Sequence, residues 1–421
     1  MRTNFQNKLI NFSFILFLFI PLSLISGPFI PDLSLVIIII NFVVLMYLNK
    51  EYEIFKDKVF VLFLFFCLVA ATVSLFSLNT SSMQSSLPYF RFGLFALAAS
   101  VLIEKKKHLL IFILYLLLFI YLALFLDSIY QYKFNENIFG LKTITNTNFR
   151  ITSFFGKDEI LGSYSIRLVP LTFFLVIFCF NHSINKKRIL LTFLVIACSV
   201  IVLLSGERTS FALFILLILF LFTSSFNLRK ILLIPIIFAA ITLMVVFSES
   251  VKIKERMINS TINQLGLSEE SERLVLFSKT YEGHYKIALN MFKEKPIFGH
   301  GAKMFRYYCS KEANFIAINA CTTHPHNFYA QMLSEAGLVG FLFLALIFFY
   351  ILFLYMKNLY FQLKYKKQFI TDLGLCLLAS YFITLFPILP SGNFFNNWLS
   401  IIIYYPLGFL IYTVKNNKFY V

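Results

Sequence analysis

Apolar residues run along almost the whole chain in long blocks, which short polar segments separate. A helix needs about 17–25 mostly apolar residues to cross the hydrocarbon core of a bilayer. On that criterion the blocks predict twelve membrane-spanning helices, at roughly residues 8–26, 32–48, 59–78, 89–103, 109–130, 161–180, 189–204, 209–225, 231–247, 327–356, 369–389 and 398–414. The sequence therefore predicts an all-α, polytopic integral membrane helix bundle.

The longest polar connection divides these helices into two sets within one integral membrane domain. We expect nine membrane helices in residues 1–247, a periplasmic loop in residues 248–326, and three further helices in residues 327–421. The first apolar block lacks the small-residue cleavage site of a secretory signal, so we expect it to remain as a helix. Within the loop, the run from Ser271 to Phe292 has apolar residues at helical spacing and predicts an amphipathic helix on the membrane or against the bundle.

Composition and charge support a membrane protein and give its orientation. The chain is 59% hydrophobic and 55 of its 421 residues are Phe, more apolar surface than a soluble domain buries. Nineteen Lys and Arg residues lie at the termini and in the connections on one side, whereas the short connections on the other side hold only Arg208. The positive-inside rule then places both termini in the cytoplasm. Because the +17 net charge follows this pattern and forms no single patch, we expect no nucleic-acid partner.

Two of the six cysteines, Cys309 and Cys321, lie outside the predicted spans, both in the long outer loop. Their twelve-residue separation suits a disulfide in an oxidising periplasm. Two free thiols, or a metal site shared with His324 and His326, are the alternatives. No second paired spacing supports a metal site.

Ionisable residues inside predicted spans are costly and usually mark a functional or paired site. They are Arg91, Asp127, Arg167, Glu335 and Asp372. All except Asp372 fall toward the outer end of their spans, which indicates a site that opens outward and argues against a solute pathway through the membrane.

Arg208 follows Ser205-Gly206-Glu207 in a hairpin too short for a real loop. Its guanidinium, beside the start of a helix, is suited to bind a phosphate. Alternatively Glu207 neutralises it and the side chain extends to the membrane interface. Arg150, which opens a second polar segment with Gly and hydroxyl residues, and Arg273 in the amphipathic run are weaker candidates of the same kind, and each is otherwise a solvated loop charge.

His324-Pro325-His326-Asn327 stands where the long loop meets the next apolar block, and Gly337 and Gly340 follow. If one helix begins at His326, it carries His326 and both glycines on one side. The spacing then predicts a titratable group above a groove of small residues that accepts a helix or a lipid chain. A His-Pro turn before ordinary glycine-mediated helix packing is the alternative. We expect Pro325 to point His324 away from this site.

Taken together, these segments resemble the O-antigen ligase and O-antigen polymerase family of bacterial inner-membrane glycosyltransferases. The likeness rests on the Ser205–Ser210 hairpin, on Pro296-Ile297-Phe298-Gly299-His300-Gly301, on the long loop, and on His326-Asn327 followed by nine residues, Gly337, two more and Gly340.

The resemblance implies transfer of a glycan from undecaprenyl diphosphate to an acceptor hydroxyl at the periplasmic face, without a metal or other cofactor. It assigns the family's histidine to His326 and the diphosphate-binding arginines to Arg208 and, less directly, Arg150 and Arg273. Asn327, His324, Gly337 and Gly340 support the site. In ligases the acceptor is lipid A-core, and in polymerases it is another lipid-linked glycan. The chain contains no Asp-x-Asp sequence, as expected of a metal-independent enzyme.

Two other functions remain open on the sequence. The motifs do not separate a ligase from a polymerase. A transporter of lipid-linked oligosaccharides is the alternative of another class, but it would more often have related halves and polar residues at the membrane midplane.

Overall fold

The computed structural model describes residues 2–77, 79–143, 150–265, 267, 278–312, 314, 316 and 318–421. The α-helices of this part of the chain are α1 (Arg2–Ser23), α2 (Phe29–Asn49), α3 (Lys58–Leu75), α4 (Thr80–Ser86), α5 (Arg91–Lys105), α6 (Leu110–Phe134), α7 (Leu161–Cys179), α8 (Ile184–Leu204), α9 (Arg208–Ser224), α10 (Phe226–Glu249), α11 (Val251–Lys254), α12 (Ser260–Gln264), α13 (Lys279–Glu294), α14 (Phe305–Tyr308), α15 (Phe328–Tyr365), α16 (Asp372–Thr384) and α17 (Asn397–Lys415). Short 3₁₀ or π turns join several of them, namely η1 (Leu24–Ser26), η2 (Tyr52–Lys56), η3 (Leu87–Phe90), η4 (Lys107–Leu109), η5 (Ser153–Phe155), η6 (Glu255–Asn259) and η7 (Ile318–Ala320).

The predicted all-α membrane bundle is confirmed. Among the described residues there is no β-strand; isolated bridges join Glu136 to Lys142 and Ile370 to Tyr420. In the described part of the chain ten helical segments are long and apolar enough to cross a membrane, and α9 and α16 are shorter apolar helices. The count is below the predicted twelve because a helix of 13 residues, such as α16, is only about 20 Å long. An apolar block predicts a helix but does not fix its length.

The loops that concern function gather at one end of the bundle, which we call the loop face. Here α1, α3, α6, α8, α10 and α16 end, and α2, α5, α7, α9, α15 and α17 begin. Hydrogen bonds join helices distant in sequence at this end: the Trp398 indole donates to the carbonyl of Leu24 at 2.8 Å, and the Tyr164 hydroxyl donates to that of Pro21 at 2.6 Å. The helix ends of the loop face are thus held together across the whole chain.

Large aromatic side chains fill the interior between α1, α5, α7 and α17. Phe17 packs against Tyr405 and Phe409, with ring centroids 4.6 and 5.9 Å away, and all three are fully buried. By contrast, Phe65, Phe119 and many other apolar side chains on the outer helix surfaces are exposed, as expected where lipid covers them.

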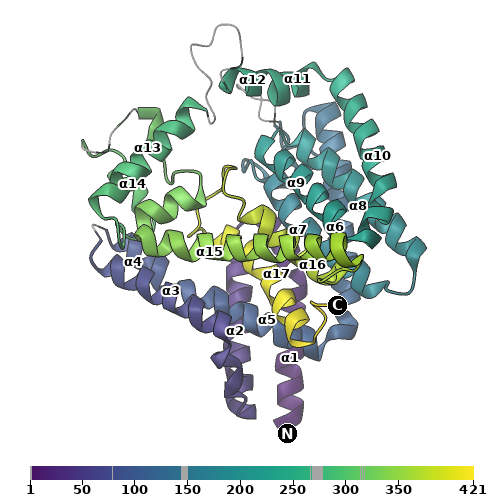
Figure 1. Ribbon diagram of the computed structural model, residues 1–421, viewed down its shortest axis with the longest axis horizontal. Helices are drawn as coiled ribbons and strands as arrows, with labels where there is room; N and C mark the ends of the chain where they lie inside the picture. The colour runs from purple at the N-terminus through teal and green to yellow at the C-terminus, as the bar shows by residue number, and fades with distance from the viewer. Residues whose placement is uncertain are drawn as a thin grey trace.

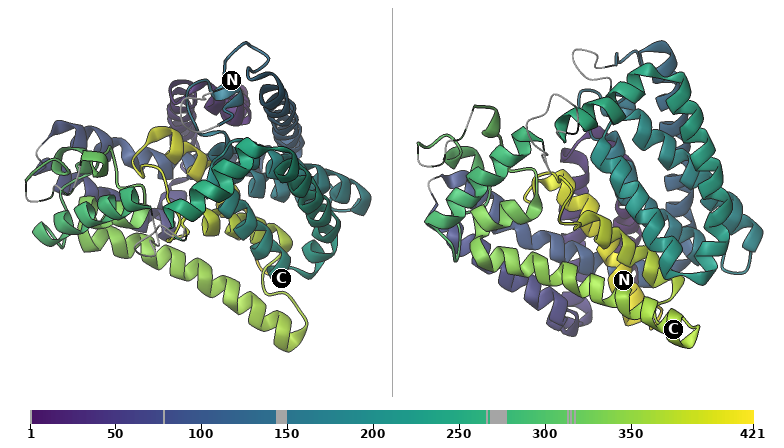
Figure 2. Two further views of the ribbon diagram at one scale, coloured as in Figure 1. Left: turned by 90° about the horizontal axis from the view of Figure 1, so that it is seen from above. Right: turned by 45° about the horizontal axis from the view of Figure 1, so that its top comes forward.

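Two groups of elements rise above the loop face. Figure 1 shows α11 and α12 over the ends of α8 and α9 on one side, and α13 and α14 beside α15 on the other. The long helix α15 packs against α13, α3, α16 and α9, and in Figure 2 it runs across the molecule along its outer side. α15 therefore contacts α13 in one group and α9, which lies below the other group.

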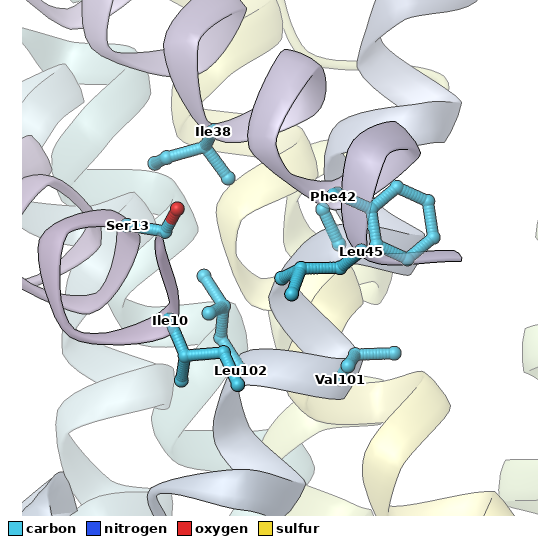
Figure 3. Close-up of a pocket in the computed structure, with 8 residues that line it drawn as sticks. Ile10, Ser13, Ile38, Phe42, Leu45, Val101 and Leu102 are labelled. Carbon is cyan, nitrogen blue, oxygen red and sulfur yellow. The ribbon is translucent and has the colours of Figure 1, made fainter. Parts of the chain in front are cut away.

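A small pocket lies between α1, α2 and α5, in the halves of these helices that are remote from the loop face (Figure 3). Its lining is apolar except for the Ser13 hydroxyl. Apart from that hydroxyl it offers no group for chemistry.

Candidate functional site

Asn327 begins α15 as its N-cap. Its side-chain oxygen accepts hydrogen bonds from the backbone N–H groups of Tyr329 and Ala330, at 2.9 and 3.1 Å. Its side-chain amide donates to the carbonyl of Pro387 at 2.7 Å, which ties the helix start to the connection between α16 and α17. Asparagine is among the best residues for this position, because it satisfies backbone N–H groups that lack partners in the first turn.

His326 lies just before the helix and not on it. Its backbone φ is +53°, in the left-handed region, and its carbonyl accepts a hydrogen bond from the N–H of Ser391 at 2.9 Å. The predicted helical-wheel relation of His326 to Gly337 and Gly340 is therefore wrong. The N-cap residue after His326 turns the chain into the helix, so helical periodicity does not extend back to the imidazole.

Gly337 breaks α15. Its φ of +61° and ψ of −158° are not helical, so the backbone groups around it lose their partners within the helix. The Pro296–Gly301 loop supplies new ones. The N–H of Leu338 donates to the carbonyl of Pro296 at 2.8 Å, and the N–H of Gly301 donates to that of Glu335 at the same distance. The inserted backbone thus provides hydrogen-bond partners at the kink in place of those lost within the helix.

Gly299 and Gly337 allow this insertion because two backbones approach each other there. A Cβ on Gly337 would lie 2.4 Å from the Ile297 carbonyl carbon, and a Cβ on Gly299 would lie 2.5 Å from that of Glu335. The predicted groove for a helix or lipid chain is therefore wrong: the space beside Gly337 is filled by the 296–298 backbone. A Cβ on Gly340 would meet Ala336 of its own helix at 2.4 Å.

Two imidazoles, those of His324 and His284, lie around His326 and form with it and Tyr281 what we call the imidazole cluster. The ring centroid of His326 lies 4.1 Å from that of His324, 5.3 Å from that of His284 and 5.7 Å from that of Tyr281. His284 and Tyr281 come from α13, the amphipathic helix predicted in this loop. The expectation that Pro325 points His324 elsewhere is wrong, because the two rings are in contact.

α13 is held against this loop at Gly283 and His284. A Cβ on Gly283 would lie 2.6 Å from the Cβ of Ala320, so only glycine lets the helix come this close. The Nδ1 of His284 lies 2.6 Å from the Ala320 carbonyl, which makes Nδ1 the protonated nitrogen of a neutral ring. Ala320 precedes Cys321, which is joined to Cys309 in a disulfide with a Cα–Cα distance of 5.1 Å. In this structure the two sulfurs bond to each other, so neither is a thiolate for a metal.

The three imidazoles of this cluster are neutral at pH 7. Burial, and then the neighbouring charge of His284, lowers the pKa of His326 to about 4. Burial and the charge of His326 lower the pKa of His324 to about 3, and burial also lowers the pKa of His284. A neutral imidazole has a lone pair that can accept a proton from a hydroxyl.

Arg208 is the first residue of α9, and its guanidinium turns toward α12. It donates hydrogen bonds to the Thr261 hydroxyl at 3.2 Å and to the Gln264 side-chain oxygen at 2.6 Å. Both partners are neutral, so the positive charge of Arg208 is not cancelled by an acidic group in these contacts.

Glu207 does not neutralise Arg208 but caps α7 instead. Its carboxylate accepts from the N–H groups of Gly162 and Ser163, at 2.6 and 3.0 Å, and from the Ser210 hydroxyl at 3.0 Å. Burial raises the pKa of Glu207 to about 7, against the lowering effect of these donors and of Arg150. The anion position at the start of α7 is therefore filled by the protein itself.

Two more arginines stand beside Arg208 and complete what we call the arginine cluster. Arg150 is paired with Glu159, and the Nε of Arg256 donates to the Gly206 carbonyl at 3.2 Å. Burial, and then the charges of Arg150 and Arg208, lowers the pKa of Arg256 to about 10. The structure thus brings the predicted Arg150 and Arg208 together and adds Arg256, which the sequence analysis missed because no local motif surrounds it.

Tyr281 connects the two clusters. Its ring lies beside that of His326, and its phenol is within electrostatic range of both Arg208 and Arg256. The neutral His326 ring and two of the arginines are therefore all near Tyr281. The predicted Arg273 lies outside the described residues.

The remaining charges predicted inside the membrane have structural partners. Arg91 pairs with Asp32 at 2.9 Å, and Asp127 accepts from the N–H of Ile138 at 2.9 Å. Arg167 donates to Ser163, and Asp372 accepts from Ser225 at 2.6 Å, away from the loop face. Each of these four charges is therefore bound within the protein.

Comparison with protein families matches residues 193–345 to the family described as O-Antigen ligase. Residues 193–345 are therefore similar to this family. The predicted resemblance is confirmed for this part of the chain, and no curated protein matches it. The O-antigen ligase domain begins within α8, ends within α15, and includes Arg208, Arg256, Tyr281 and His326, whereas Arg150 precedes it. The match and the apolar helices together indicate a multi-pass membrane protein that resembles this family over residues 193–345.

Proposed function

We propose that this chain transfers a glycan from undecaprenyl diphosphate to an acceptor hydroxyl of lipid A-core, as an inverting and metal-independent O-antigen ligase. The observation that supports it most is the meeting of the imidazole cluster and the arginine cluster at Tyr281. Transfer from a diphosphate needs both a group that accepts the proton of the hydroxyl and cations that stabilise the leaving group.

In the proposed step the acceptor oxygen attacks the anomeric carbon of the donor. The new carbon–oxygen bond forms as the bond from that carbon to the diphosphate oxygen breaks. The hydroxyl proton passes to His326, and undecaprenyl diphosphate leaves with the electron pair. Direct displacement of this kind inverts the configuration at the anomeric carbon.

The arginine cluster has the chemistry for the leaving group. Guanidinium groups bind phosphate oxygens through forked, charge-assisted hydrogen bonds, and they carry their charge at any physiological pH. Arg208 and Arg256 already donate to neutral acceptors, Thr261, Gln264 and the Gly206 carbonyl, so a diphosphate can replace or extend these contacts. Arg150 and Arg273 are secondary candidates for the same role.

A polymerase is the second candidate, because the same two clusters suit a lipid-linked glycan as acceptor. The profile of lipopolysaccharide from a deletion strain separates the two functions. A ligase deletion removes all glycan-capped core, whereas a polymerase deletion leaves core with a single repeat. A transporter of lipid-linked oligosaccharides gains no support from the two clusters, which lie together at one end of the bundle.

The direct test uses the purified chain with lipid-linked donor and acceptor in the presence of EDTA. We expect glycan transfer in EDTA and its loss in His326→Ala, by about 10²–10⁴-fold. If EDTA stops the reaction, or if His326→Ala turns over at a near-normal rate, the proposed mechanism is wrong.

The proposal also requires that the loop face is periplasmic in the bacterial inner membrane, where the donor glycan is presented. Reporter fusions at Ser82 and Asn314 are then expected to read periplasmic, and fusions at Lys106, Lys187 and Lys366 cytoplasmic. A cytoplasmic signal at Asn314 would put the two clusters on the side opposite to the donor and contradict the proposal.

A further inference from the structure

The loop that follows Gly301 carries cations that the proposed reaction has not used. Its backbone is fixed on both sides. The Glu335 carboxylate accepts from the N–H of Lys303 at 2.9 Å and from that of Phe305 at 3.0 Å. On the other side Gly301 abuts the corner of α3 and α4, where an added Cβ would lie 2.5 Å from the Ser82 hydroxyl. The side chains of Lys303 and Arg306 therefore extend from a rigid platform.

Neither of these two side chains has a partner within the described residues. Lys303 is partly buried and Arg306 is exposed, and no hydrogen bond or ion pair of the ammonium or the guanidinium occurs there. The one acidic group beside them is Glu335, whose oxygens are occupied by two backbone N–H groups and by the Gln331 amide at 2.8 Å.

A third cation stands behind them. Arg91, at the start of α5, is held by Asp32 of α2 through two contacts of 2.9 and 3.1 Å, and Asn397 of α17 donates to the same carboxylate at 3.2 Å. Lys303 is within electrostatic range of Arg91 and of Arg306, and burial together with these two charges lowers its pKa. We call Arg91, Lys303 and Arg306 the basic patch.

The basic patch lies near the imidazole cluster. Arg91 is the first residue of α5, and its partner Asp32 lies in the first turn of α2. Arg306 is within electrostatic range of His324, whose ring contacts that of His326. In Figure 1 α14 and α4 stand on the left, whereas α9, which begins with Arg208, and α12, which carries its partners Thr261 and Gln264, stand further to the right. The imidazole cluster thus has cations on two flanks.

We propose that the basic patch is an anion-binding subsite for a phosphoryl group of the lipid-anchored acceptor. The assignment of the bound phosphoryl group to the acceptor rests on the proposed function. Binding of an anion at the basic patch does not require the reaction to occur. Inverting displacement puts the attacking hydroxyl and the leaving diphosphate on opposite sides of the anomeric carbon. If the diphosphate lies at the arginine cluster, the acceptor approaches His326 from another flank, and an acceptor anchored in the membrane keeps its phosphate at the interface.

Binding of a simple anionic lipid tests the subsite without catalysis. The full chain is purified as Arg208→Ala, to weaken the arginine cluster, and dioleoyl phosphatidic acid or dioleoyl phosphatidylcholine is added before native mass spectrometry. We expect preferential retention of phosphatidic acid and an about tenfold loss of that preference when Lys303→Gln and Arg306→Gln are added, since each removes a charge-assisted contact. Gln keeps a side chain of similar polarity and a similar aliphatic stem without the positive charge.

The matched control is Lys286→Gln with Lys293→Gln, which removes the same charge from exposed positions of α13. It is expected to keep the preference for phosphatidic acid. Equal retention by the basic-patch variant and the control, at the unmodified level, would overturn the subsite, as would a lack of any preference in the Arg208→Ala chain.

Kinetics with the otherwise unmodified chain links the subsite to the acceptor. Lys303→Gln with Arg306→Gln is expected to raise the KM for acceptor about tenfold and to leave kcat and the KM for donor unchanged. An unchanged acceptor KM overturns the acceptor assignment. If the chain transfers no glycan at all but the lipid preference is lost as expected, the proposed function fails and the subsite stands.

Discussion

His326 is held by backbone, whereas Arg208 is held by side chains. The loop that carries His326 is fixed by the Asn327 cap, by the Ser391 N–H and by a disulfide upstream. The guanidinium of Arg208 extends from a helix start and is steadied by the neutral side chains of Thr261 and Gln264. The position of His326 is therefore more tightly constrained than that of the Arg208 guanidinium.

The difference corresponds to what each half has to do. A base must stand within hydrogen-bond reach of one hydroxyl, so an error of about an ångström costs much of its effect. A diphosphate spreads its charge over several oxygens, and flexible cations can follow it as it leaves. We infer that function depends on precise positioning at the imidazole cluster and on positive charge at the arginine cluster. The predictions below test this contrast.

The largest effect is expected from Gly337→Ala. An alanine at this position must adopt a positive φ, and its Cβ must displace the Ile297 backbone, which belongs to the loop inserted into α15. We expect destabilisation by more than about 3 kcal/mol and loss of transfer, because such strain and overpacking are among the strongest effects of a single substitution. Thermal unfolding of the purified chain measures the first and the transfer assay the second.

Gly140→Ala is the matched control, since Gly140 has a φ of +78° but no atom within 4 Å of an added Cβ. It is expected to cost only the backbone term, about 1 kcal/mol, with transfer intact. Equal behaviour of the two variants would mean that the inserted loop yields readily and that the His326 side is not rigid.

Arg208→Ala is expected to lower kcat by about 10²–10³-fold without changing thermal stability much, because it removes stabilisation of the leaving group. Arg208→Lys should recover little, since an ammonium does not reproduce the forked contact of a guanidinium. Full activity of Arg208→Lys would show that only charge matters at this position. The same measurement on Arg256→Ala shows whether the neighbouring guanidinium also stabilises the leaving group.

Cys309→Ser with Cys321→Ser is expected to cost the loop about 2–4 kcal/mol, the usual contribution of a disulfide. The disulfide tethers the carbonyl partner of His284, so transfer should fall as well, mainly through kcat. Hydrogen exchange of residues 309–326 with and without reductant measures the loosening. Unchanged exchange would mean that the disulfide does not hold the imidazole cluster.

His324→Ala is expected to have the smallest effect, a loss of a few-fold in kcat at pH 7. The ring packs on that of His326 at 4.1 Å, and its removal admits water and weakens the burial that lowers the pKa of His326. His324→Phe preserves the packing and should retain more activity. A loss as large as that of His326→Ala would give His324 a direct role.

The sequence predicted the helices because apolar blocks of spanning length have few other outcomes, and it predicted α13 from its spacing. It placed His326, Arg208 and Arg150 at one end of the bundle by topology alone. It did not predict the break at Gly337, because the spacing of His326 and two glycines is the same whether a helix runs on or ends. That break depends on the Pro296–Gly301 backbone, thirty-six residues or more away from Gly337.

Arg256 and His284 show a second limit. Arg256 comes within range of Arg150 and Arg208 only because the chain folds back over the hairpin at Gly206. His284 faces His326 because Gly283 lets α13 close on Ala320. Neither position has a local pattern that distinguishes it from other charged or polar residues in the loop, so only the tertiary arrangement identifies them.

The central claim is that neutral His326 accepts the proton of the acceptor hydroxyl, and the pH dependence of kcat/KM tests it most directly. The measurement compares the unmodified chain with Glu207→Gln, which removes the nearby carboxyl whose pKa is about 7. Because the active form of His326 is unprotonated and its pKa is about 4, the rate of Glu207→Gln should be level from pH 8 down to about 6 and fall only as pH approaches 4. A fall centred near the ordinary value of 6.5, or a rate that rises as His326 becomes protonated, would contradict the account.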